Sequence, residues 1–70
     1  MGKDLIGKCL LTFILNQKRM SPTELSDKTG ISIYQLSAYI NDKRLMSLPT
    51  ARVISKAIGC SIDDLYEWYI

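Results

Sequence analysis

Few side chains in this sequence could support covalent or metal chemistry, and their spacing favours neither. The 70 residues include two cysteines, Cys9 and Cys60, and no histidine. The cysteines fit neither a zinc site nor a redox Cys-x-x-Cys motif, so we expect two buried thiols rather than one disulfide. Asp63 and Asp64 lack a neighbouring base and suit the start of a helix. Without a phosphate-cradling glycine loop as well, we expect no enzyme, no cofactor and no metal site.

Side chains that could bind a polar or anionic ligand occur between Ser32 and Arg44. Gln35 and Ser37 fall within one short predicted helix, and Lys43 and Arg44 follow it directly. The net charge is +2 at pH 7, which permits nucleic-acid binding without arguing for it. The position of the charges is more informative, because the basic pair follows a helix while acidic residues cluster near the C-terminus.

A helix is predicted to start directly before this region. Ser21 is a candidate N-cap, and Pro22 then occupies the first helical position. Glu24 falls three residues after the cap, as a capping box requires. Gly30 suits the left-handed position that ends a helix. These signals predict a short helix between Ser21 and Gly30.

The same start signal recurs at once, with Ser32 as the cap and Gln35 as its box partner. Two capped helices joined by a tight turn at 29–32 predict a helix-turn-helix over about residues 21–41. The alternative is an ordinary helical hairpin with no role in binding nucleic acid.

Three further helices are expected around this motif. The first spans about Lys3 to Lys18, another starts at Ser47 and ends at Gly59, and the last is capped by Ser61. Apolar residues make up 47% of the chain, enough for one small core. We therefore expect an all-α fold, with residues 1–70 forming a single compact five-helix domain.

The predicted first helix is apolar on more than one face. Ile6, Leu10 and Phe13 form a second stripe, which either the C-terminal helix covers or a second copy of the chain contacts. Trp68 and Tyr69 are unusual in a free tail and are expected to pack within the monomer or against a partner. These five residues form the candidate oligomer or partner surface.

The chain resembles the phage repressor/Cro-type helix-turn-helix proteins, also described as lambda-repressor-like or XRE-like. The matching stretches are Met20-Ser21, Leu25-Ser26, Gly30-Ile31-Ser32, Leu36-Ser37, Lys43-Arg44 and Ala51–Leu65. The resemblance implies a five-helix domain that binds operator DNA, usually as a dimer, and regulates transcription. The expected location is the cytoplasm of a bacterial cell, with a phage or prophage origin and no membrane span, since the apolar runs are too short.

Two departures from the family pattern stand out. Many members carry a phosphate-contacting Gln where this chain has Pro22. An Arg–Glu ion pair that members often form is replaced by Leu15 and Ile40. Replacing both partners by apolar residues leaves no buried charge unpaired, which supports this alignment.

The leading functional hypothesis is a small DNA-binding transcriptional regulator whose recognition helix, residues 32–41, enters the major groove of double-stranded DNA. The candidate base contacts are Ile33, Tyr34, Gln35, Ser37 and Ala38. The candidate phosphate contacts are Ser32, Asn41, Lys43 and Arg44. The alternative is a protein-interaction module on the same fold, an antirepressor or a modulator of another repressor, with little or no DNA binding.

Overall fold

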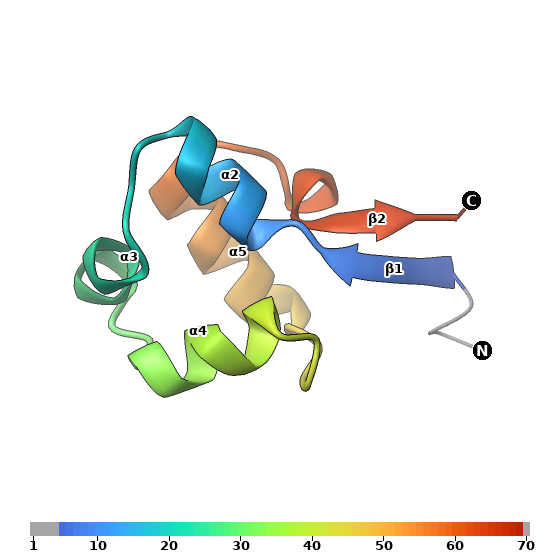
Figure 1. Ribbon diagram of the computed structural model, residues 1–70, viewed down its shortest axis with the longest axis horizontal. Helices are drawn as coiled ribbons and strands as arrows, with labels where there is room; N and C mark the ends of the chain where they lie inside the picture. The colour runs from blue at the N-terminus through green and yellow to red at the C-terminus, as the bar shows by residue number, and fades with distance from the viewer. Residues whose placement is uncertain (1–4, 70) are drawn as a thin grey trace.

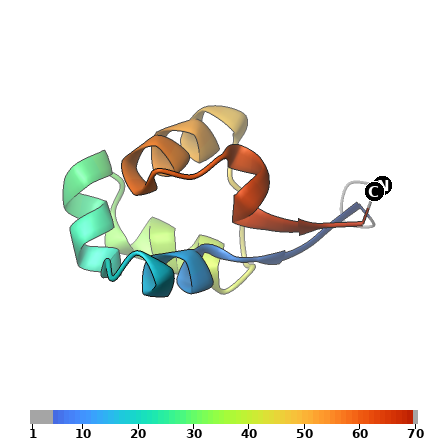
Figure 2. The ribbon, with the colours of Figure 1, turned by 90° about the horizontal axis from the view of Figure 1, so that it is seen from above.

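The computed structural model describes residues 5–69 and arranges them as a helical body with a two-stranded sheet at one end (Figure 1). The elements in chain order are β1 (Ile6–Cys9), α2 (Leu11–Gln17), α3 (Pro22–Thr29), α4 (Ile33–Ile40), α5 (Leu48–Ile58), the 3-10 helix η1 (Ile62–Leu65) and β2 (Tyr66–Trp68). The two strands project from the body in both views (Figures 1 and 2). None of the helices within residues 5–69 is long and apolar enough to cross a membrane.

The expectation of an all-α, five-helix fold is wrong. Within residues 5–69 the structure has four α-helices, and a strand lies near each end of this range. The first two residues of the expected first helix, Lys3 and Asp4, lie outside the described residues. Within the described part, Ile6–Cys9 form β1 and pair antiparallel with β2, with Ile6 opposite Trp68, and α2 begins at Leu11. Gly7 lies within the segment that fails to become helical, and glycine disfavours a helix interior by about 1 kcal/mol relative to alanine. The expected fifth helix is a single 3-10 turn, followed by aromatic residues that favour a strand.

The helix starts predicted from the serines are confirmed. The hydroxyl oxygens of Ser21, Ser32 and Ser47 each accept the backbone N–H three residues later, at 3.1, 3.2 and 3.3 Å. Gly30 and Gly59 end α3 and α5 in the left-handed conformation, with φ of 76° and 86°. Local residue choices therefore fix where α3, α4 and α5 begin, and glycines end two of them.

One hydrophobic core joins the helices to the sheet. Its centre is fully buried at Leu11, Leu25, Leu36, Ile54 and Leu65, which come from α2, α3, α4, α5 and η1. The predicted replacement of an ion pair by apolar residues fits this core. Leu15 is buried in the core, and Ile40 packs against its edge.

Candidate nucleic-acid interface

Helix α4 has one face in the core and the opposite face in solvent. Leu36 and Tyr39 are buried, which anchors the helix to the body. Tyr34 is 86% exposed and Ile33 is 41% exposed. The remaining candidate base contacts are also accessible, Gln35 and Ser37 being exposed and Ala38 half-buried. The structure therefore gathers the five predicted base-contact residues on the free side of one anchored helix.

The turn before α4 is held by two side chains that the sequence analysis did not single out. The Ser26 hydroxyl donates to the carbonyl of Ile31 at 2.6 Å. The Thr29 hydroxyl donates to the carbonyl of Leu25 at 2.8 Å and accepts the N–H of Ile31 at 3.2 Å. Hydroxyl residues in the last turn of a helix that ends at glycine are the signal that could have identified them, because they readily bond nearby backbone. These bonds fix the turn that sets the orientation of α4 relative to α3.

The C-terminal end of α4 is closed by a Schellman motif. The N–H of Lys43 donates to the carbonyl of Ala38 at 2.9 Å, and the N–H of Asp42 donates to that of Tyr39 at 3.1 Å. Asp42 takes the left-handed position of the motif, with φ of 59°. Asn41 donates from its side-chain amide to the Ser37 hydroxyl at 3.1 Å. The predicted phosphate contacts after the helix therefore start from a fixed backbone.

The segment that follows, residues 42–46, is called the basic loop here. Each strand makes a hydrogen bond to it. The Asp42 carboxylate accepts the backbone N–H of Cys9 in β1 at 2.9 Å. The hydroxyl of Tyr66 in β2 accepts the N–H of Met46 at 3.1 Å. Burial raises the pKa of Tyr66, so its hydroxyl stays neutral around pH 7. Burial, with a further contribution from Asp42, also raises the pKa of the Cys9 thiol.

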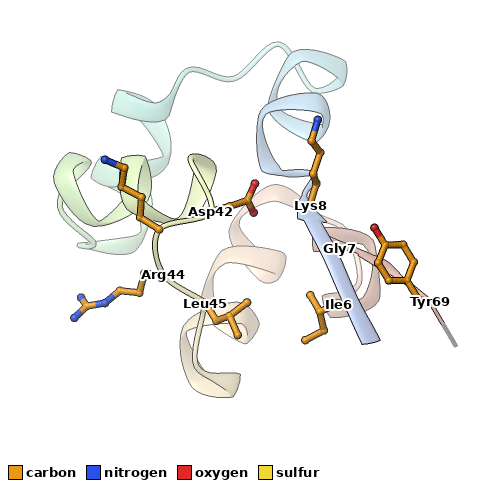
Figure 3. Close-up of a pocket in the computed structure, with 8 residues that line it drawn as sticks. Ile6, Gly7, Lys8, Asp42, Arg44, Leu45 and Tyr69 are labelled. Atoms are coloured by element: carbon orange, nitrogen blue, oxygen red, sulfur yellow. The ribbon is translucent and has the colours of Figure 1, made fainter. Parts of the chain in front are cut away.

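A groove of about 510 Å³ lies between β1 and the basic loop (Figure 3), and is called the basic groove here. Its charged lining consists of Lys8 from β1 with Asp42, Lys43 and Arg44 from the loop. The Arg44 side chain points away from the groove towards solvent (Figure 3). Sequence reasoning missed Lys8 and Asp42, because Lys8 was assigned to a helix and the bond from Asp42 joins residues far apart in the chain.

The five residues of the candidate partner surface do not form one patch. Ile6 and Trp68 border one hollow on the sheet, next to Leu45 and Met46. Leu10 and Phe13 line a different groove, beside α2 and η1. The helical stripe predicted from Ile6, Leu10 and Phe13 is wrong, because Ile6 belongs to β1.

Within residues 5–69, no group of three or more Cys, Asp or Glu side chains could hold a metal ion. Cys9 and Cys60 are free thiols, and both are half-buried rather than buried as expected. The side chains of the α4 face and the basic loop offer hydrogen bonding, apolar contact and charge.

Comparison with known proteins agrees with this geometry. The family model of the Cro/C1-type HTH DNA-binding domain matches residues 11–69. The chain is 39% identical over 71 residues to the SPbeta prophage-derived uncharacterized HTH-type transcriptional regulator YopS of Bacillus subtilis (strain 168), covering 100% of this chain and 96% of that relative. It is 34% identical over 59 residues to the SPbeta prophage-derived uncharacterized HTH-type transcriptional regulator YotL of the same strain, covering 83% of this chain and 74% of that protein. The chain therefore belongs to the Cro/C1-type helix-turn-helix DNA-binding domain family.

Proposed function

We propose that this chain is a small transcriptional regulator of prophage or bacterial type that binds duplex DNA with α4 in the major groove. The observation that carries the proposal is the division of α4 into a buried face and a free face, with the basic loop directly after it. Helix-turn-helix proteins use such an anchored helix to reach base edges. The relatives described as HTH-type transcriptional regulators support the regulatory role.

Base reading would depend on a mixture of polar and apolar contacts. Tyr34, Gln35 and Ser37 can donate or accept hydrogen bonds at base edges. Ile33 and Ala38 can offer only apolar contact, which suits the methyl group of thymine. Tyr34 is the most exposed of the five and the leading candidate for sequence preference.

Phosphate contacts would come from both ends of α4. Ser32 and the backbone N–H groups at the start of α4 suit an anion, because a helix N-terminus carries partial positive charge. Asn41 keeps a second amide hydrogen free, because its side-chain nitrogen donates only one hydrogen to Ser37. Lys43 and Arg44 would neutralise further phosphates in a sequence-independent way.

We further propose that residues 1–70 form one domain, with the helix-turn-helix at about 21–41, and that it binds a palindromic site as a homodimer. Two half-sites would then lie about 34–36 Å apart. Phe13 and Trp68, which are exposed at two separate places on the surface, are alternative candidate contacts for the second copy. Molar mass in solution, with and without DNA carrying the promoter beside its own gene, tests the dimer.

A salt series tests DNA binding itself. The affinity of the wild-type protein for that promoter duplex should fall steeply between about 50 and 200 mM salt, because cations that contact phosphates release counterions. No binding at the low-salt end, to this duplex or to mixed-sequence duplex DNA, would overturn the proposal.

One observation favours a second function, a protein-interaction module that modulates another repressor. The free face of α4 carries two large side chains with few polar atoms, Tyr34 and Ile33, and isolated exposed apolar groups of this kind suit a protein partner as well. This second function predicts a protein retained on a column of the wild-type chain, together with no DNA binding at low salt.

A further inference from the structure

We propose that the basic groove holds the sugar–phosphate backbone of the duplex next to the base pairs read by α4, with Lys8 as an additional phosphate ligand. The proposal rests on the proposed DNA-binding function and extends its contact surface from the helix-turn-helix to β1. Lys8 lies far from α4 in the sequence, and only the folding of β1 beside the basic loop brings it to the same groove as Lys43.

The charges around the groove favour an anion. Three cationic side chains, Lys8, Lys43 and Arg44, line it together with one carboxylate, Asp42. That carboxylate is occupied in part, because it accepts the N–H of Cys9 at 2.9 Å. Lys8 extends from β1 beside Asp42, whereas Arg44 extends outward (Figure 3). Lys8 is therefore the cation that β1 adds to the groove, and Lys43 and Arg44 are the cationic residues that the basic loop adds to its lining.

Side chains are better placed to bind an anion here than the backbone at the end of α4. The C-terminal end of a helix carries partial negative charge, which disfavours a phosphate. The N–H groups of Asp42 and Lys43 are already used in the Schellman motif. Cationic side chains would therefore supply the main attraction, and binding at the groove should depend strongly on salt.

The shape of the groove suits an extended backbone. Ile6 and Leu45 lie on opposite sides of it (Figure 3) and offer apolar surface to deoxyribose rings. Gly7 leaves room for the Tyr69 ring, since a Cβ at Gly7 would lie 2.5 Å from the Tyr69 hydroxyl oxygen. The groove also lies next to the end of α4, because Asp42 and Lys43 follow the C-cap of that helix directly and line the groove.

The test uses the full chain and a duplex carrying the site that the wild-type protein selects from a random library. Lys8→Gln removes one cation from an exposed side chain and leaves the backbone bonds of β1 in place. Lys56→Gln is the matched control, because Lys56 is an exposed lysine of α5 and is not part of the groove. Lys8→Gln should lower the slope of log affinity against log salt by about 0.9, and Lys56→Gln should leave it unchanged.

A second variant removes a negative charge from the groove instead of a positive one, so the two variants should change affinity in opposite directions. Asp42→Asn removes the negative charge from the groove but keeps a side-chain oxygen that can accept the N–H of Cys9. It should increase affinity at low salt several-fold, whereas Lys8→Gln decreases it. Thermal unfolding of each variant, followed by circular dichroism, establishes that the compared proteins are folded at the temperature of the binding assay.

Phosphate ethylation interference places the contact on the DNA. A phosphate whose ethylation weakens wild-type binding should lose that effect with Lys8→Gln, and it should lie within one or two positions of those that lose it with Lys43→Gln. The proposal is overturned if the Lys8→Gln slope equals that of Lys56→Gln, or if the sensitive phosphate lies elsewhere. It is also overturned if a polyglutamate peptide binds the wild type through Lys8 while DNA binding is insensitive to Lys8→Gln. If the wild type binds no DNA at low salt, the proposed function itself has failed.

Discussion

Asp42 and Arg19 occupy equivalent positions after two helices. Each is the left-handed residue that follows a helix, with φ of 59° and 55° respectively. Side chains other than glycine lose roughly 1–2 kcal/mol in this region. Asp42 has a compensating long-range bond, through its carboxylate to the N–H of Cys9. The chain thus keeps an aspartate where glycine is the usual choice, and the aspartate connects the basic loop to β1.

Substituting glycine at both positions separates backbone strain from the side-chain bond. Arg19→Gly should raise the free energy of unfolding by up to about 1 kcal/mol, since it relieves the left-handed strain while adding backbone entropy to the unfolded chain. Asp42→Gly also loses a charged hydrogen bond worth about 1.5–3 kcal/mol, so it should be less stable than wild type. Urea unfolding measures both. Equal effects of the two substitutions would show that the Cys9 bond contributes nothing.

The two classes of predicted DNA contact should respond differently to alanine. Lys43→Ala combined with Arg44→Ala should weaken binding to all duplex sequences alike and reduce the salt slope by about 0.9 for each phosphate that is no longer neutralised. Tyr34→Ala should change sequence preference, because each good base contact contributes about 1–3 kcal/mol of discrimination. Binding of each variant to a panel of single-base-pair changes in the selected site provides the measurement. The reverse pattern would mean that the DNA-facing surface lies elsewhere on the molecule.

Alkaline pH should destabilise the fold through Cys9 and Tyr66, because burial raises the pKa of both groups. A raised pKa means that the folded state holds its proton more tightly than the unfolded state. The stability it contributes is therefore complete below the unfolded pKa and is lost as pH rises through the folded pKa. With ordinary values of 9.0 for the thiol and 10.0 for the phenol, the loss should begin near pH 9 and steepen above pH 10.

Urea unfolding at a series of pH values between about 8 and 11 follows this decline in stability. Tyr66→Phe has no ionisable hydroxyl and should flatten the curve above about pH 10. If the free energy of unfolding of the wild type does not decline between about pH 8 and 11, the pKa values of Cys9 and Tyr66 are not raised by folding.

Among the elements, α4 and α5 begin with the same cap but face different surroundings. Ser32 and Ser47 each accept an N–H three residues later at nearly equal distance. Ser32→Ala and Ser47→Ala should each lower the free energy of unfolding by about 1 kcal/mol. Only Ser32→Ala should also weaken DNA binding when both variants are fully folded, because only Ser32 is proposed to contact a phosphate. Equal DNA affinities of the two variants would show that Ser32 acts only as an N-cap and contacts no phosphate.

The accuracy of the sequence predictions differs between elements for a physical reason. The starts of α3, α4 and α5 depend on residues three apart, such as Ser21 with the N–H of Glu24, and these local signals are visible in the sequence. The strands depend on pairing between Ile6 and Trp68, at opposite ends of the chain. The stretch from Leu5 to Leu15 carries enough apolar residues to suggest one helix, and the pairing of β1 with β2 cannot be seen in that stretch alone. Strand preference depends strongly on such tertiary contacts.

The same distinction applies to the candidate site. The outward face of α4 was predictable, because helical spacing and the positions of Leu36 and Tyr39 determine which side is buried. The basic groove was not predictable, because it requires Lys8 to lie in a strand beside the basic loop. Local patterns therefore located the proposed base-reading surface, and only the long-range arrangement shows its extension to β1.

Across the whole molecule, the two ends of the described chain hold its middle in place. β1 and β2 pair with each other, and each also bonds the basic loop, through Cys9 to Asp42 and through Met46 to Tyr66. The sheet therefore has a role beyond covering the core. It fixes the loop that carries Lys43 and Arg44 relative to α4.

Tyr66→Phe tests whether the sheet really restrains the loop. The substitution keeps the buried ring but removes the hydroxyl that accepts the N–H of Met46 at 3.1 Å. Amide hydrogen exchange at Met46 near pH 7 should accelerate, because that N–H loses its partner and the loop opens locally. Exchange at Gly30, whose N–H bonds to Ser26 within α3, should change only as much as global stability does. Equal acceleration of exchange at both amides would mean that Tyr66 acts only through the core. Faster exchange at Met46 alone, together with lower DNA affinity, would show that the strands hold the loop in its binding position.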